Sequence, residues 1–156
     1  MLLMSLYSGA IYASENEGYN IEIGTTNRNG KEVEVLRSKD GGYLQITQIG
    51  QNSQNVKITT STFDEKILIA GKVQNKGTTI NIEVYKGEEC TKKYSTTVGI
   101  TETFSQNIEL AEGENKVFIY YKNGNDGTDN YVTIYIRRES AESMEKLKSY
   151  LDVPSL

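Results

Sequence analysis

The chain has 156 residues and a formal net charge of −4, a length that fits one domain of ordinary size. Its 17 Lys and Arg residues are interspersed among 21 Asp and Glu residues, which argues against a nucleic-acid partner, because phosphate binding needs clustered basic residues. There is no His and only one Cys, Cys90, so the commonest general base and a Cys-based zinc site are both missing, and we expect no cofactor.

An uncharged, apolar segment covers residues 1–13 and gives way abruptly to a polar run at residues 14–18. Small residues permit cleavage after Ala13 or Ala10, as at the rear of a secretory signal, although the positively charged leader is missing. The alternative is a buried N-terminal strand. The segment is too short to span a bilayer, so we expect a secreted or cell-surface chain without stable membrane insertion of its mature part.

Residues 19–49 contain three short segments in which apolar and polar residues alternate, at 19–25, 31–37 and 42–48. The Asn-Gly and Asp-Gly pairs between them favour primed hairpin turns. The pattern predicts a small β-meander. Because a ribbon of this size buries little apolar surface alone, it should either lean on the domain that follows or remain loose.

Seven more strands are predicted after the polar joint at residues 50–55, and their spacing of about ten residues is typical of a β-sandwich. The ranges are about 56–60, 66–73, 78–85, 91–98, 103–110, 115–122 and 131–138. Alternation assigns to the core Val56, Ile58, Ile67, Ile69, Gly71, Val73, Ile80, Ile82, Val84, Phe104, Ile108, Leu110, Val117, Ile119, Tyr121, Val132, Ile134 and Ile136. The expected fold is all-β, an antiparallel sandwich of about seven strands at 55–138.

An amphipathic helix is predicted at residues 140–152, with Ser140 as its N-cap. Met144, Leu147 and Leu151 lie three and four residues apart and form its apolar side. Because an isolated helix of this length is marginal in water, these residues should pack either on the sandwich or on a bound partner.

Four segments appear in an order seen in a known family of domains. They are Ile69-Ala-Gly71-Lys-Val73, Ile80 to Tyr85, Phe104 to Leu110, and Leu110-x-x-Gly113-x-Asn115-x-Val117. With them, residues 55–138 resemble the immunoglobulin-like (Big-type) domains of exported bacterial proteins. Gly113 suits a tight turn, and Asn115 can hydrogen-bond the local backbone. The paired Cys and the Trp of antibody domains are absent, so the resemblance implies the sandwich but no antibody-like recognition surface.

The last two strands predict the candidate binding surface. We expect Val117, Ile119 and Tyr121 to face inward opposite Ile136, Ile134 and Val132, respectively. The other face then carries Phe118, Tyr120, Tyr131, Thr133, Tyr135 and Arg137. Such an aromatic stripe suits stacking on sugar rings or docking of a protein. Alternatively, the rings only stabilise the hairpin, or the N-terminal meander covers them.

The loop at 123–130 is a weak calcium candidate, because hard cations prefer oxygen ligands. It offers Asn123, Asn125, Asp126 and Asp129. The loop does not match the Asp-x-Asp-x-Asp-Gly spacing of a calcium loop, so an ordinary hairpin turn is the favoured reading and no metal is expected.

Catalysis is not expected. Glu22, Glu34, Glu83 and Glu109 occupy solvent-facing strand positions and are most simply read as parts of solvated faces. The sequence therefore predicts a non-catalytic, exported module for adhesion or spacing, whose partner is a protein or a glycan at the cell surface. The alternatives are a carbohydrate-binding module that uses the Tyr stripe and a small accessory or inhibitor subunit.

Overall fold

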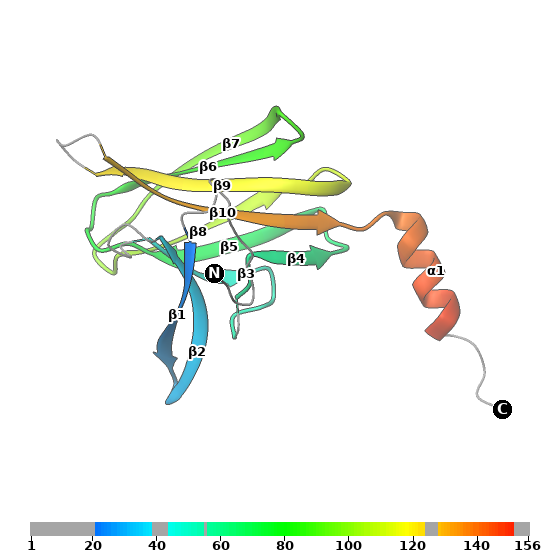
Figure 1. The fold of residues 1–156 in the computed structure, drawn as a ribbon, viewed down its shortest axis with the longest axis horizontal. Helices are drawn as coiled ribbons and strands as arrows, with labels where there is room; N and C mark the ends of the chain where they lie inside the picture. The colour runs from blue at the N-terminus through cyan, green and yellow to red at the C-terminus, as the bar shows by residue number, and fades with distance from the viewer. Residues whose placement is uncertain (1–20, 39–43, 55, 124–127, 152–156) are drawn as a thin grey trace, which may run out of the picture.

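The computed structural model describes residues 21–38, 44–54, 56–123 and 128–151 (Figure 1). These residues form ten strands followed by one helix. The strands are β1 (Ile21–Arg28), β2 (Lys31–Ser38), β3 (Gln45–Ile49), β4 (Thr59–Thr62), β5 (Lys66–Lys72), β6 (Thr79–Lys86), β7 (Glu89–Thr97), β8 (Thr103–Glu109), β9 (Gly113–Asn123) and β10 (Thr128–Arg138), and the helix is α1 (Ala141–Leu151).

The strands form two five-stranded sheets that pack face to face as a sandwich. Sheet A has the order β1-β2-β3-β5-β8, and sheet B has the order β4-β10-β9-β6-β7. Neighbouring strands run antiparallel, except that β4 runs parallel to β10. The expected all-β sandwich is therefore confirmed, with ten strands.

The prediction of about seven sandwich strands was wrong because the N-terminal strands belong to sheet A. Strand β3 pairs with β5, placing Ile46 opposite Gly71. This pairing satisfies backbone groups that an open β5 edge would leave without partners. Leu36, Leu44 and Ile46 then join the main apolar core. The meander thus leans on the larger domain through a shared sheet.

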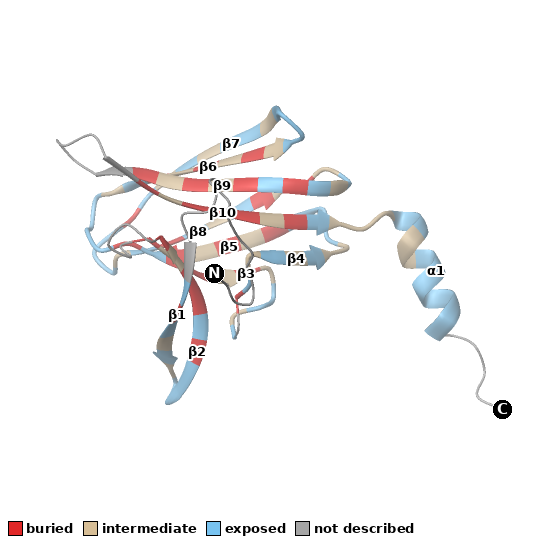
Figure 2. Cartoon of the chain, in the orientation of Figure 1, coloured by how far each residue is buried: buried red, intermediate tan, exposed pale blue. Residues whose placement is uncertain are grey.

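Buried residues of both sheets form one apolar core, and Figure 2 shows buried positions along strands such as β2, β9 and β10. Alternation predicted it well: every expected core residue is buried except Ile58, which is partly buried against the core. Val98 and Ile49 are further members of the core. Burial of aliphatic side chains from both sheets is the main force that holds the layers together.

The hairpin of β9 and β10 differs from its predicted register by two residues. Ile119 lies opposite Val132, and Val117 lies opposite Ile134. Pairing continues to the ends of the strands, at Asn123 and Thr128. Because side chains alternate with a period of two, a shift of two residues leaves every side chain on its predicted face.

The turn before β9 is fixed by Asn115, as the sequence indicated. Its amide nitrogen donates to the carbonyl oxygens of Ala111 at 2.8 Å, Gly113 at 3.0 Å and Ile136 at 3.2 Å, and its Oδ1 accepts from Ala111 N at 2.9 Å. Gly113 has a φ of 90°, a conformation that a side chain disfavours. One buried amide therefore bonds four backbone groups at this turn.

Helix α1 forms as predicted, and Ser140 caps it by accepting a hydrogen bond from Ser143 N at 3.0 Å. The expectation that its apolar side packs on the sandwich is wrong. The helix has no buried residue, and Leu147 and Leu151 are exposed. Glu139 N donates to Thr62 O at 2.8 Å, which keeps the chain along β4 until it leaves the sheets (Figure 1). Within the described ranges, no helix is long and apolar enough to cross a membrane.

Candidate functional site

The outer face of sheet B carries the predicted aromatic side chains, and we call this surface the aromatic face. It consists of Tyr85 on β6, Phe118 and Tyr120 on β9, and Tyr131 and Tyr135 on β10, all of them partly exposed. Strand β9 lies between β6 and β10, so these residues sit at the middle of the sheet. A surface built on central strands is held on both sides by hydrogen-bonded neighbours.

Three of the predicted residues are in direct ring contact. The ring centroid of Phe118 lies 5.0 Å from that of Tyr120 and 5.3 Å from that of Tyr131. Tyr131 is also directly opposite Tyr120 in the ladder. These tilted arrangements are favourable for aromatic pairs. The predicted stripe is therefore a packed cluster.

Thr133 shows how closely these side chains lie. It points to the outer face, opposite Phe118, yet it is only 2% exposed. Small residues between aromatic neighbours lose their solvent contact in this way. The rings thus do stabilise the hairpin, but their own outer surfaces remain partly exposed.

Glu83 on β6 links two of the tyrosines. The Tyr85 hydroxyl donates to Glu83 Oε1 at 2.5 Å, and the Tyr120 hydroxyl donates to Oε2 at 3.1 Å. The hydrogen bond to Glu83 raises the pKa of Tyr85 to about 12, because ionising the phenol would lose this bond and place two negative charges together. Lys116 Nζ lies 5.7 Å from the Tyr85 ring centroid, within reach of a cation–π interaction.

Tyr85, Glu83 and Lys116 were not among the predicted site residues. Alternation of Ile80, Ile82 and Val84 already placed Glu83 and Tyr85 on the outer side of their strand. The missing information was that β6 is the neighbour of β9, because strands far apart in sequence meet only in the folded sheet.

Tyr135 and Arg137 lie toward the other end of β10. Tyr135 is opposite Lys116 on β9 and Thr59 on β4. Arg137 is exposed and forms an ion pair with Glu139 at 3.4 Å. Such an exposed pair contributes little stability and can rearrange around a ligand. The predicted residues therefore share one face, with Arg137 at its margin.

The described part of the N-terminal meander does not cover the aromatic face. Strands β1 to β3 belong to sheet A, and β2 reaches β10 on the inner side, where Ser38 Oγ donates to Asn130 Oδ1 at 3.3 Å. Both residues of this pair are buried. The alternative in which the meander buries the rings is therefore wrong for β1 to β3.

The other sequence candidates are less informative. Asn125 and Asp126 of the calcium candidate lie outside the described residues, as do the side chains of Asn123 and Asp129, so that hypothesis stays a prediction. Across the parts of the chain that the structure describes, no cluster of three or more acidic or Cys side chains could hold a metal ion. Cys90 is a partly exposed residue of β7.

Glu109, another of the acids considered for catalysis, is occupied in ion pairs. Its carboxylate lies 3.2 Å from Lys92 Nζ and 3.8 Å from Lys66 Nζ. Glu83 is bound by the two tyrosines described above. The absence of catalysis stays a prediction.

A comparison of the chain with models of protein families, with curated proteins and with solved structures gave no match. What the findings establish is the architecture, a two-sheet β-sandwich with one C-terminal helix and an aromatic face on sheet B.

Proposed function

We propose that the chain is a non-catalytic, exported module for adhesion or spacing at a cell surface, and that it contacts a protein partner through the aromatic face. The observation that carries the proposal is the cluster of partly exposed rings at the middle of sheet B. Aromatic side chains at the centre of a contact supply much of the binding energy of protein interfaces.

The rigidity of this surface favours binding. The Tyr120 hydroxyl is fixed to Glu83, and the Phe118 ring is packed against two neighbours. Side chains that are already ordered lose little conformational entropy when a partner binds. The partly exposed rings therefore offer contact area at low entropic cost.

We further propose that residues 55–138 are an immunoglobulin-like domain of the Big type. The sheet order β10-β9-β6-β7 corresponds to strands G, F, C and C′ of that fold, and the β5–β8 pair corresponds to B and E. The hydrogen bonds of Asn115 at the start of β9 support the same assignment, because they fix the turn as a tyrosine corner does at strand F. The proposed export depends on the apolar segment at 1–13.

The proposal is tested by replacing Tyr120 and Tyr135 together with Ser. The labelled wild-type chain and the labelled variant are applied separately to intact cells of the organism that produces the protein and to cells that this organism contacts. The amount of labelled protein retained on the cells is measured. We expect the double variant to lose most of the retained signal while it keeps a cooperative thermal unfolding transition. Tyr150→Ser is the matched control, since Tyr150 lies on α1, is 70% exposed and is outside the aromatic face.

Equal retention of the double variant and the wild-type chain contradicts contact through the aromatic face. Loss of retention with Tyr150→Ser alone assigns the contact to α1 instead. Protease treatment of the cells should abolish retention when the partner is a protein.

Carbohydrate binding by the same face is the second candidate. The observation in its favour is the Glu83 carboxylate held between tyrosine hydroxyls, because sugars combine ring stacking with hydrogen bonds to such groups. Retention that survives protease but is lost after periodate oxidation of the cells, together with binding to defined glycans on an array, supports this alternative over a protein partner.

A further inference from the structure

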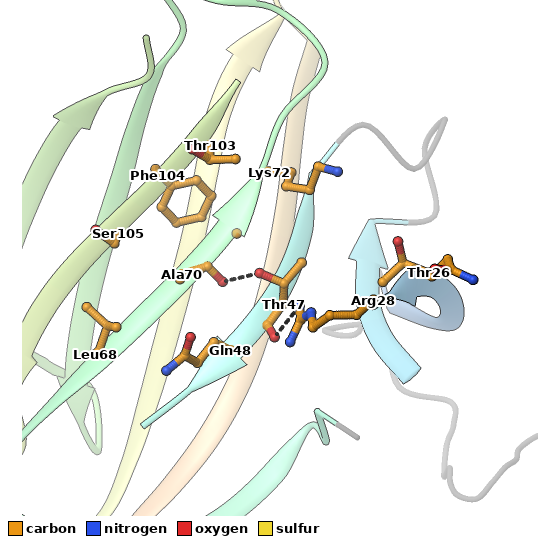
Figure 3. A pocket seen from close by; sticks show the side chains of 12 residues that line it. Thr26, Arg28, Thr47, Gln48, Leu68, Ala70, Lys72, Thr103, Phe104 and Ser105 are labelled. Carbon is orange, nitrogen blue, oxygen red and sulfur yellow. Dashed lines mark hydrogen bonds between the residues drawn. The ribbon is translucent and has the colours of Figure 1, made fainter. Parts of the chain in front are cut away.

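A groove lies on the outer face of sheet A, on the opposite side of the sandwich from the aromatic face (Figure 3). Its volume is about 520 Å³, within the range of roughly 300–1,000 Å³ that is usual for small-ligand sites. Four strands contribute to it, namely β1, β3, β5 and β8. We call it the sheet A groove.

The groove forms at an irregularity in the sheet. Ile46 pairs with Gly71, but Gln48 pairs with Ala70, so Thr47 is an extra residue of β3. Its hydroxyl donates to Ala70 O at 3.4 Å. Such β-bulges interrupt the ladder and redirect side chains, and they are frequent beside functional sites.

Arg28 fastens β1 to this bulge. Its guanidinium donates to Thr47 O at 3.2 Å and to Ser53 O, which lies beyond the end of β3. Figure 3 shows its side chain reaching from β1 to Thr47. These bonds hold one wall of the groove in place.

The lining of the groove is positively charged. Among the described residues that line it, Arg28 and Lys72 are charged and none is Asp or Glu, although the whole chain has a net charge of −4. The hydrogen bonds that Arg28 makes here go to carbonyl oxygens, which carry no formal charge. Two cations with no acid in the same lining favour an anionic ligand.

The remaining side chains specify the ligand further. Four residues with a hydroxyl and two with an amide are among those that line the groove, namely Thr26, Thr47, Thr103, Ser105, Asn27 and Gln48. Those of Thr47, Thr103, Asn27 and Gln48 each already make one hydrogen bond within the chain, and each keeps further capacity to donate or accept. Leu68, Ala70 and Phe104 are the apolar side chains of the lining. Hydroxyl and amide groups both donate and accept, as ring hydroxyls of a sugar require, whereas the ionised side chains of an acidic peptide only accept.

We propose that the sheet A groove binds an acidic saccharide, a sugar that carries a carboxylate or a sulfate. Lys72 and Arg28 contact the anionic group, and the hydroxyl and amide side chains contact the ring hydroxyls. This site is independent of the aromatic face, so the module has two binding surfaces, one on each outer face of the sandwich.

The test is a titration of the full chain with saccharide probes. Binding is measured by calorimetry and by the changes in amide chemical shifts. The probes are a short uronic-acid oligosaccharide, a short sulfated oligosaccharide and a neutral N-acetylglucosamine oligomer of the same length. We expect the acidic probes to bind, to shift amides of β3, β5 and β8, and to bind more weakly at high salt. Comparing the two acidic probes distinguishes a carboxylate from a sulfate as the recognised group.

The variant Lys72→Glu should weaken binding of the acidic saccharide about tenfold or more, the effect of losing one charge-assisted hydrogen bond. Lys72 is exposed, so this variant should fold. Lys146→Glu is the matched control, because it makes the same charge change on α1, and it should bind as the wild-type chain does.

Three results overturn the proposal: equal binding of neutral and acidic saccharides, equal weakening by Lys72→Glu and Lys146→Glu, or no binding of either acidic probe at millimolar concentration. Binding of an oligo-glutamate peptide in place of both acidic saccharides also overturns it and assigns the groove to acidic peptides.

Discussion

In both the β9–β10 hairpin and the β1–β2 hairpin, apolar and polar residues alternate along the sequence. Their surroundings in the folded chain differ. The first lies at the middle of sheet B, with β6 paired to one side and β4 to the other. The second lies at the edge of sheet A, and β2 pairs with β3 at Leu36–Ile46 and Arg37–Gln45. Ile119 of β9 is fully buried, whereas Ile23 of β1 is 51% exposed.

This difference shows that strand neighbours, rather than the local pattern, decide how firmly a hairpin is held. Strands paired on both sides form a rigid support, on which the aromatic face rests. An edge hairpin needs individual attachments, and Arg28 provides one through its bonds to Thr47 and Ser53. The two candidate binding surfaces should therefore respond differently to substitution.

The largest effect on stability is expected from shortening a buried aliphatic side chain in the β9–β10 hairpin. Ile134→Ala should lower the free energy of unfolding by about 2–5 kcal/mol, because Ile134 is fully buried and its loss leaves a cavity. The corresponding change on the edge hairpin, Ile23→Ala, should cost less than about 0.5 kcal/mol. Urea denaturation measures both. Similar losses would show that the two hairpins are equally integrated.

Asn115→Ala should have the next largest effect, about 2–4 kcal/mol, because four buried or partly buried backbone groups lose their bond to its amide. The edge hairpin offers a matched amide: Asn27 Oδ1 accepts from Gly30 N at 3.1 Å in an exposed turn. Its replacement by Ala should cost about 0.5–1 kcal/mol. Thermal unfolding of both variants checks the ranking, and a larger loss with Asn27→Ala would contradict it.

Two glycines extend the comparison. A Cβ at Gly71 would collide with the backbone oxygen of Gln45 and with the Phe104 ring, so Gly71→Ala should destabilise by about 1–3 kcal/mol. A Cβ at Gly24 on β1 would meet the guanidinium of Arg37, which can move aside, so Gly24→Ala should cost less than about 1 kcal/mol. Chemical denaturation of the two variants decides whether the interior of sheet A is less tolerant than its edge.

The smallest effect on stability is expected from ionisation of Tyr85 on the aromatic face. The pKa of Tyr85 is raised from 10.0 to about 12, so its neutral form is favoured in the folded chain. The stability that comes from this hydrogen bond is complete below about pH 10 and is lost as the pH rises through about 12. Glu83→Gln should move the titration of one tyrosine back toward 10.0, as measured by ultraviolet absorbance.

The Tyr85→Phe variant identifies the late-titrating group, since it should remove that transition from the curve of the wild-type chain. Superimposable titration curves for the wild-type chain and Glu83→Gln would show that the carboxylate does not hold the phenol in solution.

The alternation of apolar and polar residues along the chain determined which side chains face the core. It assigned the core residues, from Val56 to Ile136, and it placed Phe118, Tyr120, Tyr131 and Tyr135 on one face. Residue type indicated the N-cap at Ser140 and the role of Asn115 in its turn. These features depend on residues close in sequence, where the period of the backbone fixes the direction of each side chain.

Only the tertiary structure decided which strands became neighbours. The pairing of β3 with β5 made a ten-stranded sandwich, and the pairing of β6 with β9 brought Glu83 and Tyr85 to the aromatic face. The sheet A groove depends in the same way on Arg28 meeting a bulge at Thr47. A local pattern fixes which way a side chain points, but the choice among strands with similar patterns depends on how two whole sheets close around one core.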